Sequence, residues 1–544
     1  MNHKLGADVA ILGGGVGGCA AALALAEAGK QVILTEETVW IGGQLTSQAV
    51  PPDEHGWIEH QGCTFSYRRF RATVRNYYRK NYPLLPHYRC ADHLNPGNGW
   101  VSPLCHEPRV ALASLEMMLA PHVSAGRVRI LRKHRLAGVH LRDAAHLAAV
   151  VVSDARQVET AITADYFLDA TENGDLLPYA GAEYVTGAES RAQTGEANAP
   201  EHAAPGNNQA FSLCFALEHR AGENHVIPPP ADWGYWKDYR PALRPPWPGP
   251  LLSWNAVNPR TLAPIRYRFD PHNEAPIPFS GLWSYRRILD RSLFVPGAYA
   301  SDVTLVNWPM IDYMEGDLLT TSEETRAVHL NAARQLSLSM VYWLQTEAPR
   351  PDGGLGWPGL RLRGDLLGSG DGLALAPYIR ESRRIRAERT IVERDLSAAF
   401  RSGDTLAERY NDTVGVGYYR IDLHPSSGGD NYIDVASLPF RIPLGALIPV
   451  RMENLLPAAK NIGVTHITNG CYRLHPVEWN VGEAAGTLCA YALDHSVRPR
   501  VVLHNDRHLA AFQAALECRG VQLRWPENLN LEDGDSHIHA RGSS

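Results

Sequence analysis

The chain is poor in cysteine, with eight among 544 residues, and no two of them form a CxxC pair. So few cysteines in so long a chain cannot build the disulfide framework of a small secreted protein. The lack of CxxC also argues against a dithiol redox pair of the thioredoxin kind. We therefore expect free thiols in a reducing compartment, and the cytoplasm is the predicted location.

Three further absences narrow the function. Apart from the glycine-interrupted N-terminal stretch, no apolar run approaches the roughly 18 residues of a membrane span, so neither a span nor a signal peptide is expected. The net charge is −6, and the arginine-rich run 380–389 also holds Glu381 and Glu388. Without a basic block, nucleic-acid binding is not expected. The histidines are scattered with no HExxH-like spacing, which disfavours a metal hydrolase and predicts no metal site.

What is present is an ordinary globular composition in a long chain. Apolar residues make up 44% and charged residues 20% of the sequence. At 544 residues the chain exceeds what one hydrophobic core usually supports, so two or three domains are expected.

The most informative stretch is the N-terminus. A short apolar strand, residues 7–12, leads into Gly13-x-Gly15-x-x-Gly18, an alanine-rich helix and a second strand that ends at Glu36. This is the dinucleotide fingerprint in its full strand–turn–helix–strand context. The glycines allow a tight turn, a close approach of backbone amides to a pyrophosphate, and helix–strand packing. Glu36 lies where a carboxylate accepts the ribose hydroxyls, so the pattern predicts an adenine dinucleotide.

Coarser patterns suggest how the rest is organised. We expect helices over 66–80, 108–120 and 321–345, and an antiparallel meander of strands over 128–131, 136–141, 148–152 and 161–168. Runs rich in proline, glycine and polar residues predict loops over 82–108 and 351–370, and a run rich in Gly, Ala, Pro and Glu predicts a domain boundary over 186–208. A stretch rich in Trp, Tyr and Pro follows from about residue 206 to 440, and a polar tail, expected to be frayed, follows Glu527.

Several blocks together resemble FAD-dependent oxidoreductases of the glutathione-reductase-like group, specifically those described simply as FAD-dependent oxidoreductases. The resemblance covers most of the chain and rests on the following blocks: the N-terminal fingerprint, Gly42-Gly43-Gln44-Leu45-Thr46, Asp169-Ala170-Thr171-Glu172-Asn173-Gly174-Asp175 with Ala180–Ala182, 209–215, 306–309, 378–384, 461–466, 471–476 and 482–486. Where the family has Ala-Thr-Gly this chain has Ala170-Thr171-Glu172, so the tight glycine turn is expected two residues later, at Gly174.

The resemblance implies a fold and a cofactor. It implies an α/β chain with a Rossmann-like FAD-binding domain that is discontinuous, formed by residues 1–205 and 440–500. A mixed α/β substrate domain, 206–439, is inserted, and 501–544 form a C-terminal extension with a polar tail. Since no second GxGxxG follows, a separate NAD(P)H domain is not expected.

The FAD-binding residues follow from the fingerprint and from the family blocks. They are Gly13, Gly15, Val16, Gly17, Gly18, Glu36, Glu37, Gly42, Gly43, Gln44, Leu45, Thr46, Ala170, Thr171, Asp175, Gly482 and Ala485. The helix with Gly482 and Gly486 matches the returning family element whose N-terminus lies near the isoalloxazine.

Candidate catalytic residues lie in the returning segment, which the resemblance brings close to the flavin. His466 and His475 are the leading candidates for the base that removes a substrate proton. Arg473 is expected to hold a substrate carboxylate or favour an anionic reduced flavin, and Glu478 to orient His475 from one helix turn away. A purely structural role for His475, which precedes Pro476, stays open.

Other residues are weaker candidates. His55, His60 and Cys63 follow the second glycine pair, where some flavoproteins attach FAD covalently. The substrate-facing candidates, each with an alternative role in packing or surface ion pairs, are Tyr418, Tyr419, Arg420, Arg383 and Arg384.

We predict an enzyme that oxidises a small organic molecule at a C–H bond next to nitrogen, oxygen or a carbonyl, with O2 or another carrier taking the electrons. The aromatic insert favours an apolar or ring-containing substrate, such as a biosynthetic intermediate. Two alternatives stay open: a flavin monooxygenase or NAD(P)H-dependent reductase, and a flavin-containing binding or assembly subunit without turnover.

Overall fold

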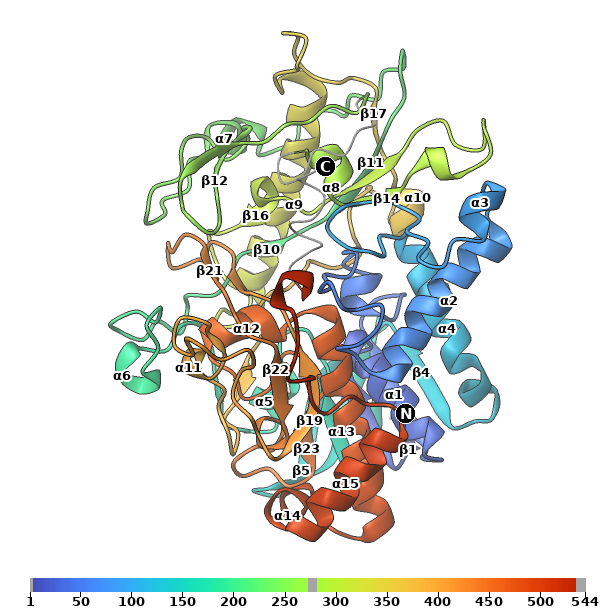
Figure 1. Cartoon of the computed structure of the whole chain (residues 1–544), viewed down its shortest axis with the longest axis vertical. Coiled ribbons are helices and arrows are strands. Elements are labelled where there is room, and N and C mark those ends of the chain that lie inside the picture. Colours follow the sequence, from blue (N-terminus) through green and yellow to red (C-terminus); the bar gives the residue numbers. More distant parts are fainter. Residues whose placement is uncertain (1–2, 273–280, 535–544) are drawn as a thin grey trace.

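A five-stranded parallel sheet forms the centre of the computed structural model, which describes residues 3–272 and 281–534 (Figure 1). Its inner strands are apolar and almost wholly buried, as expected for a sheet covered on both faces. In order across the sheet the strands are β23 (Leu455–Pro457), β8 (Tyr166–Asp169), β2 (Val9–Leu12), β3 (Val32–Glu36) and β4 (Val128–Arg132).

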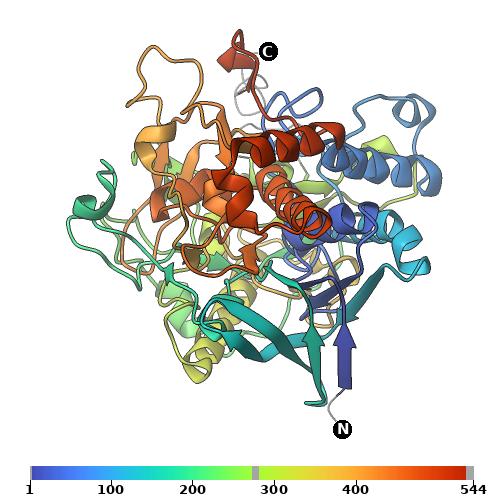
Figure 2. The same ribbon diagram turned by 90° about the horizontal axis from the view of Figure 1, so that it is seen from below.

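Distant parts of the sequence meet in this sheet. Strand β23 pairs in parallel with β8, which itself pairs in parallel with β2. Helix α13 (His475–His495) lies along α1 (Val16–Glu27), so segments from the two ends of the chain lie side by side in the lower half of the molecule (Figures 1 and 2). A Cβ on Gly482 would lie 2.0 Å from the Gly17 carbonyl oxygen, so glycines let the two helix backbones touch. The α/β fold with a returning C-terminal strand and helix is confirmed.

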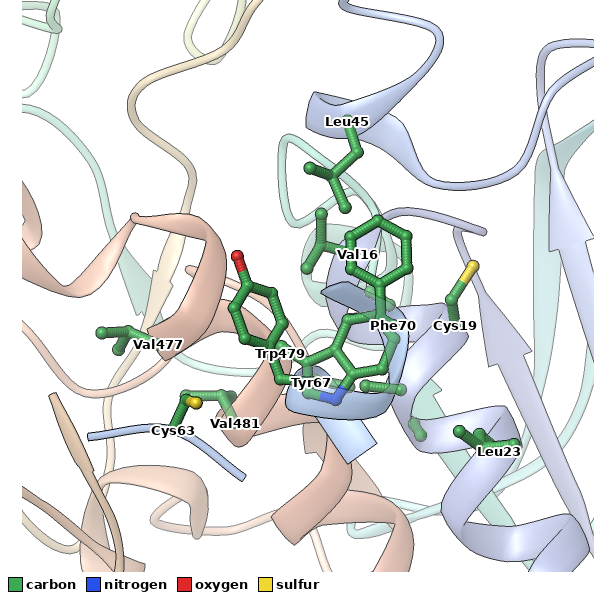
Figure 3. Close-up of a cluster of buried hydrophobic side chains, with 14 of the residues drawn as sticks. Val16, Cys19, Leu23, Leu45, Cys63, Tyr67, Phe70, Val477, Trp479 and Val481 are labelled. Atoms are coloured by element: carbon green, nitrogen blue, oxygen red, sulfur yellow. The ribbon is translucent and has the colours of Figure 1, made fainter. Parts of the chain in front are cut away.

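A hydrophobic cluster fixes this helix pair against α2 (Phe65–Asn81). Figure 3 shows Val16 of α1, Tyr67 and Phe70 of α2 and Trp479 of α13 gathered in one cluster. The indole of Trp479 lies 5.6 Å from both the Tyr67 and the Phe70 ring centroids. Each aromatic ring buried here removes a large apolar area from water, which stabilises the N-terminal end of α1 in one position.

The predicted four-strand meander is partly wrong. The antiparallel strands are β5 (His134–Asp143), β6 (His146–Asp154) and β7 (Glu159–Thr163), and β1 (His3–Gly6) joins β7 in parallel at the sheet edge (Figure 2). The predicted strands 128–131 and 161–168 do not both belong to it: β4 pairs with β3, and 161–168 is split between β7 and β8. A short apolar run has the same pattern in the parallel sheet and in the antiparallel meander, so the sequence pattern alone could not assign these strands to one sheet.

The middle of the chain forms the upper half of the molecule, with its own hydrophobic core of residues between Ala210 and Tyr432 (Figure 1). An antiparallel sheet lies in it, with strands in the order β14 (Arg287–Leu289), β15 (Val303–Val306), β11 (Phe215–His219) and β17 (Leu360–Leu362). Helix α9 (Glu323–Thr346), predicted from the sequence, packs there. Tryptophans of the insert are buried in this core, including Trp236, Trp247, Trp254, Trp283 and Trp308, and Trp233 packs against it.

The remaining elements are short ladders and helices. Paired strands are β9 (Tyr184–Val185) with β18 (Arg384–Ile385), β10 (Phe211–Ser212) with β16 (Asp312–Tyr313), β12 (Asn255–Val257) with β13 (Pro264–Arg266), β19 (Thr413–Gly417) with β22 (Phe440–Pro443), and β20 (Ile421–Leu423) with β21 (Ile433–Val435). The other helices are α3 (Pro86–Arg89), α4 (Pro108–Ser124), α5 (Leu176–Tyr179), α6 (Arg191–Thr194), α7 (Trp233–Asp238), α8 (Leu282–Tyr285), α10 (Gly364–Leu367), α11 (Glu393–Leu396), α12 (His466–Tyr472), α14 (Pro499–His504) and α15 (Asp506–Cys518).

These elements decide several predictions. The helices expected over 66–80 and 108–120 are α2 and α4. The loops expected over 82–108 and 351–370 contain short elements, α3 in the first and β17 and α10 in the second. The predicted fraying after Glu527 is wrong as far as Gly534, because Leu529 and Leu531 pack beside Trp57 and Trp525. The rest of the tail, 535–544, lies outside the described residues.

The sequence predicts neither a membrane span nor a metal site. Within 3–272 and 281–534, no helix combines the length and apolarity needed to cross a membrane, and no group of His, Cys, Asp and Glu side chains is arranged to hold a metal ion. All eight cysteines are free thiols, as predicted.

Candidate functional site

A cavity of about 320 Å³ opens at the carboxyl ends of β2, β3 and β8. Ligands of open α/β sheets bind at this edge, beside the strand ends. Eight of the predicted FAD-binding residues line the cavity: Gly13, Gly15, Glu36, Glu37, Gly43, Ala170, Thr171 and Asp175. We call it the nucleotide cavity.

The N-terminus of α1 points into this cavity without a side-chain cap. Gly15 is the N-cap residue, and no side chain accepts from the first-turn N–H groups, which begin at Val16. These amides and the helix dipole favour an anion. A Cβ on Gly13 would lie 2.3 Å from the Ala170 oxygen and one on Gly18 2.0 Å from the Gly13 oxygen, so only glycine fits the turn.

Glu36 closes the other side of the fingerprint. Its Oε2 accepts the Gly14 N–H at 3.1 Å and its Oε1 accepts the Thr38 N–H at 2.8 Å, which fixes the carboxylate at the end of β3. Burial raises the pKa of Glu36. Glu37 follows it, exposed at the cavity mouth. The acid therefore lies where a ribose would meet it.

The second glycine pair forms a tight turn against the first. Gly42 has φ +108° and donates its N–H to the Gly14 oxygen at 2.6 Å, and Gly43 begins a short 3-10 helix, Gly43–Leu45. Leu45 reaches the cluster in Figure 3, and the Thr46 hydroxyl donates to the Ile41 oxygen at 2.6 Å. Leu45 and Thr46 therefore position this turn from behind.

The turn after β8 is held by one buried carboxylate. Asp169 accepts the Thr171 N–H and hydroxyl at 3.0 and 2.7 Å and the Leu176 N–H at 3.1 Å, and burial raises its pKa to about 7. Gly174 has φ +64°, so the left-handed residue of this turn lies where the sequence predicted it. Asp175 pairs with Arg383 at 3.0 Å.

A buried ion network lies beneath the helix N-terminus. Lys460 is wholly buried, pairs closely with Glu172 and lies 3.5 Å from Glu478. Glu478 also accepts from Gln44 at 2.8 Å, and its pKa is raised to about 7 by burial and by Glu172. Glu172 Oε1 lies 2.8 Å from where a Cβ on Gly15 would stand. A pyrophosphate at this helix end would repel Glu172, so Lys460 must balance that charge.

We expect Lys460→Met to lower the free energy of unfolding by about 3 kcal/mol, because the buried Glu478 and the partly buried Glu172 would both lose their cation. Urea unfolding followed by circular dichroism measures this. Lys30→Met is the matched control: Lys30 pairs with Asp494, whose side chain is 55% exposed, and its loss is expected to cost less than about 1 kcal/mol. Equal effects of the two changes would contradict the network's role.

A second cavity, of about 420 Å³, lies beyond a thin wall. The wall is the extended segment 375–380: Pro377 and Ile379 face the nucleotide cavity, whereas Tyr378 and Arg380 line the second cavity. The Tyr378 N–H donates to the Ser212 oxygen at 2.8 Å, which anchors the segment on β10. We call this space the substrate cavity.

Sequence reasoning missed the most suggestive group in the substrate cavity. His424 lines it, and its Nδ1 lies 2.6 Å from Oδ2 of the wholly buried Asp312. Asp312 Oδ1 accepts from Ser212 at 2.6 Å and lies 3.0 Å from Arg380. Although burial alone would raise it, Arg380 and His424 hold the pKa of Asp312 below its ordinary value.

This arrangement makes His424 a candidate base. A carboxylate accepts the proton on Nδ1, so Nε2 is left as an acceptor on the cavity side. Burial and the Arg380 charge lower the pKa of His424 below its ordinary 6.5, against the pull of Asp312. The imidazole is therefore neutral near pH 7 and can take up a proton. The only sequence signal was a histidine that directly follows a short strand.

The two predicted histidines lie elsewhere, and neither lines a described cavity. His466 Nδ1 lies 2.9 Å from both oxygens of Glu381, which also pairs with the buried Arg384. His475 Nδ1 accepts the Asp53 N–H at 3.1 Å, and burial lowers its pKa to about 3. A catalytic role for either histidine stays a prediction.

Of the other predicted residues in the returning segment, one lines the substrate cavity and the rest lie outside both cavities. Arg473 lines the substrate cavity and donates to the Tyr378 hydroxyl at 3.1 Å. The predicted pairing of Glu478 with His475 is wrong, because the Glu478 carboxylate bonds to Gln44 and Lys460 instead. Gly482 and Ala485 are buried in α13 and do not line the nucleotide cavity, since their helix packs along α1.

The candidates for covalent attachment lie away from the nucleotide cavity. His55 packs with Trp57 and Trp525, and His60 is exposed. Cys63 is buried in the cluster of Figure 3, and burial raises the pKa of its thiol to about 12. Of the substrate-facing candidates, Tyr419 and Arg420 line the substrate cavity, whereas Arg383 and Arg384 form ion pairs.

Together these features fit FAD. The uncapped helix end, the two glycine turns and Glu36 form a cradle for a dinucleotide. Gly43 and Thr171 line the same cavity as Pro377 and Ile379 of the wall, so its flavin half would lie between them.

Comparison with known proteins gives one match along the chain. A family model described as FAD dependent oxidoreductase matches residues 8–516. No curated protein is similar enough to count as a match.

Solved structures resemble parts of the chain. One is L-proline dehydrogenase from P. horikoshii, with 16% identity over 34% of this chain and 24% of that one and a TM-score of 0.18. Another is the myxobacterial chondrochloren halogenase CndH, with 14% identity over 41% of this chain and 45% of that one and a TM-score of 0.21. A third is the rebeccamycin biosynthetic enzyme RebC with reduced flavin, with 17% identity over 40% of this chain and 39% of that one and a TM-score of 0.24. The chain covers less than half the length of each of the three.

Proposed function

The chain belongs to the FAD dependent oxidoreductase family, and from this membership we propose that it dehydrogenates a small organic molecule at a C–H bond next to nitrogen, oxygen or a carbonyl. The His424–Asp312 pair carries the proposal, because it places a neutral, oriented base on a cavity one chain segment away from the nucleotide cavity. Bound FAD supplies the acceptor for the hydride that such a substrate loses.

The residues of this chain divide the remaining tasks. His424 takes the proton from the substrate heteroatom, and Asp312 holds the ring in the tautomer that leaves Nε2 free. Tyr378 of the wall segment and Arg473, joined by a hydrogen bond, both line the substrate cavity. The wall segment is fixed by its backbone hydrogen bonds to β10 and to Ser47, so the two cavities keep a constant position relative to each other. We propose that O2 or another carrier then receives the electrons.

An anaerobic titration of FAD-loaded protein tests the proposal. We expect the visible flavin absorbance to bleach with at least one member of a panel of alcohols, hydroxy acids and amines, and not with NADPH alone. Bleaching by NADPH would instead favour a monooxygenase or reductase. A flavin that no compound reduces, in a protein that holds a stable partner in pull-down, would favour a subunit without turnover. Peroxide release after admitting air identifies O2 as the acceptor.

A further inference from the structure

The walls of the substrate cavity carry many charges, and nearly all of them are already paired. The geometry points to an uncharged, polyhydroxylated ring compound, such as a sugar or cyclitol, oxidised at a secondary alcohol. This inference rests on the function proposed above and narrows it to one class of substrate.

Each arginine that lines the cavity has a carboxylate within 4 Å. The pairs are Arg286 with Asp53 (3.1 Å), Arg380 with Asp312 (3.0 Å), Arg473 with Asp422 (3.2 Å), Arg260 with Asp434 (3.8 Å) and Arg420, closely, with the same Asp434. The remaining acid that lines the cavity, Glu54, pairs with Arg71 at 2.9 Å. Within the described part of the chain, no lining guanidinium is left without such a partner.

This pairing disfavours a charged substrate. Arginines that bind carboxylate or phosphate usually do so with their own guanidinium forks, in bidentate bonds. Here each guanidinium already lies beside an acid, and Arg260 and Arg420 share Asp434. An anionic substrate would therefore have to compete with these carboxylates for the same guanidinium groups. A hydroxyl group makes no such demand, because it donates to a carboxylate and accepts from a guanidinium at once.

The uncharged part of the lining fits the same class of ligand. Five tyrosines and one tryptophan line the cavity: Tyr267, Tyr285, Tyr378, Tyr419, Tyr432 and Trp100. The Trp100 and Tyr285 rings lie 4.6 Å apart, and Arg286 lies 5.1 Å above the Tyr285 ring. An aromatic ring offers a flat apolar face with a polar edge, which suits the C–H face of a ring whose rim bears hydroxyls.

His424 supplies the chemistry for such a ring. The O–H bond of one secondary alcohol breaks and its proton goes to His424 Nε2. The C–H bond at the same carbon breaks as well, and its hydrogen leaves with both electrons to FAD. A C=O bond forms, so the alcohol is oxidised to a ketone while FAD is reduced by two electrons. No further reactant is needed for this half of the reaction.

The test compares matched neutral and anionic ligands by two measurements. Isothermal titration calorimetry records binding of D-glucose, myo-inositol and D-glucuronate to the FAD-loaded protein, and anaerobic absorbance records bleaching by each. L-lactate and benzylamine serve as substrates of other classes. We expect the neutral compounds to bind and at least one to bleach the flavin, and D-glucuronate to bind at least about tenfold more weakly.

A charge change sharpens the test. Asp434→Asn leaves Arg260 and Arg420 without their shared carboxylate, so the preference for D-glucose over D-glucuronate should fall by about tenfold or more. Asp404→Asn removes an exposed acid paired with Arg401 outside the cavity and should change neither affinity.

Several results would overturn the inference. They are D-glucuronate binding more tightly than D-glucose to the unaltered protein, no binding of either neutral compound, or an Asp434→Asn preference equal to that of Asp404→Asn. Bleaching by benzylamine or L-lactate but by no polyol would overturn the substrate class and leave the proposed oxidation standing. Bleaching by NADPH alone would overturn the proposed oxidation itself.

Discussion

Replacing His424 with asparagine is expected to lower the rate of flavin reduction by substrate about 10²–10⁴-fold while FAD stays bound. The asparagine amide can still donate to Asp312, so the contact that holds β16 against this loop is kept and only the base is lost. Anaerobic stopped-flow measurement of flavin bleaching gives the rate, and the flavin spectrum of the purified variant gives its FAD content.

The pH dependence separates a chemical role from a structural one. His424 must be neutral to accept a proton, so kcat/KM should fall as pH drops through its pKa. Since burial and Arg380 place that pKa below 6.5, the loss should begin below pH 6.5 and should vanish in His424→Asn. His225→Asn, at a histidine that pairs with an exposed glutamate, should keep both rate and profile. A loss of less than about tenfold in His424→Asn, or an unchanged acidic limb, would remove His424 from the proposed mechanism.

The fold could be predicted because its signals are local. The glycines, the helix and Glu36 lie in one continuous segment, and each acts on backbone a few residues away. The return of β23 and α13 was predicted only through the family resemblance. The meander was mistaken at its ends because β4 and β8 are short apolar strands, and their partners β3 and β2 are chosen by tertiary packing.

The substrate cavity could not be predicted in the same way. His424 becomes a candidate base only through Asp312, which lies 112 residues earlier and reaches it across β16 and β20. The arginines of the cavity likewise find acids from distant segments, as Arg286 finds Asp53. The tryptophans of the insert mark its core and not the cavity, because large apolar rings in an insert most often pack inside it.

Gly15→Val is expected to give a folded protein that purifies without FAD. A Cβ at this N-cap position meets only Glu172 Oε1 at 2.8 Å, the end of a flexible side chain, and Ala170 O at 3.7 Å, so the fold can accommodate it. The valine methyls would, however, cover the uncapped N-terminus of α1, where we expect the pyrophosphate to bind. The ratio of flavin to protein absorbance measures occupancy, and circular dichroism measures folding.

Gly17→Val is the contrasting variant: its Cβ would lie 1.8 Å from the Ala458 oxygen, so it should lose fold and cofactor together. Full FAD occupancy in Gly15→Val would mean that the dinucleotide does not bind at this helix end.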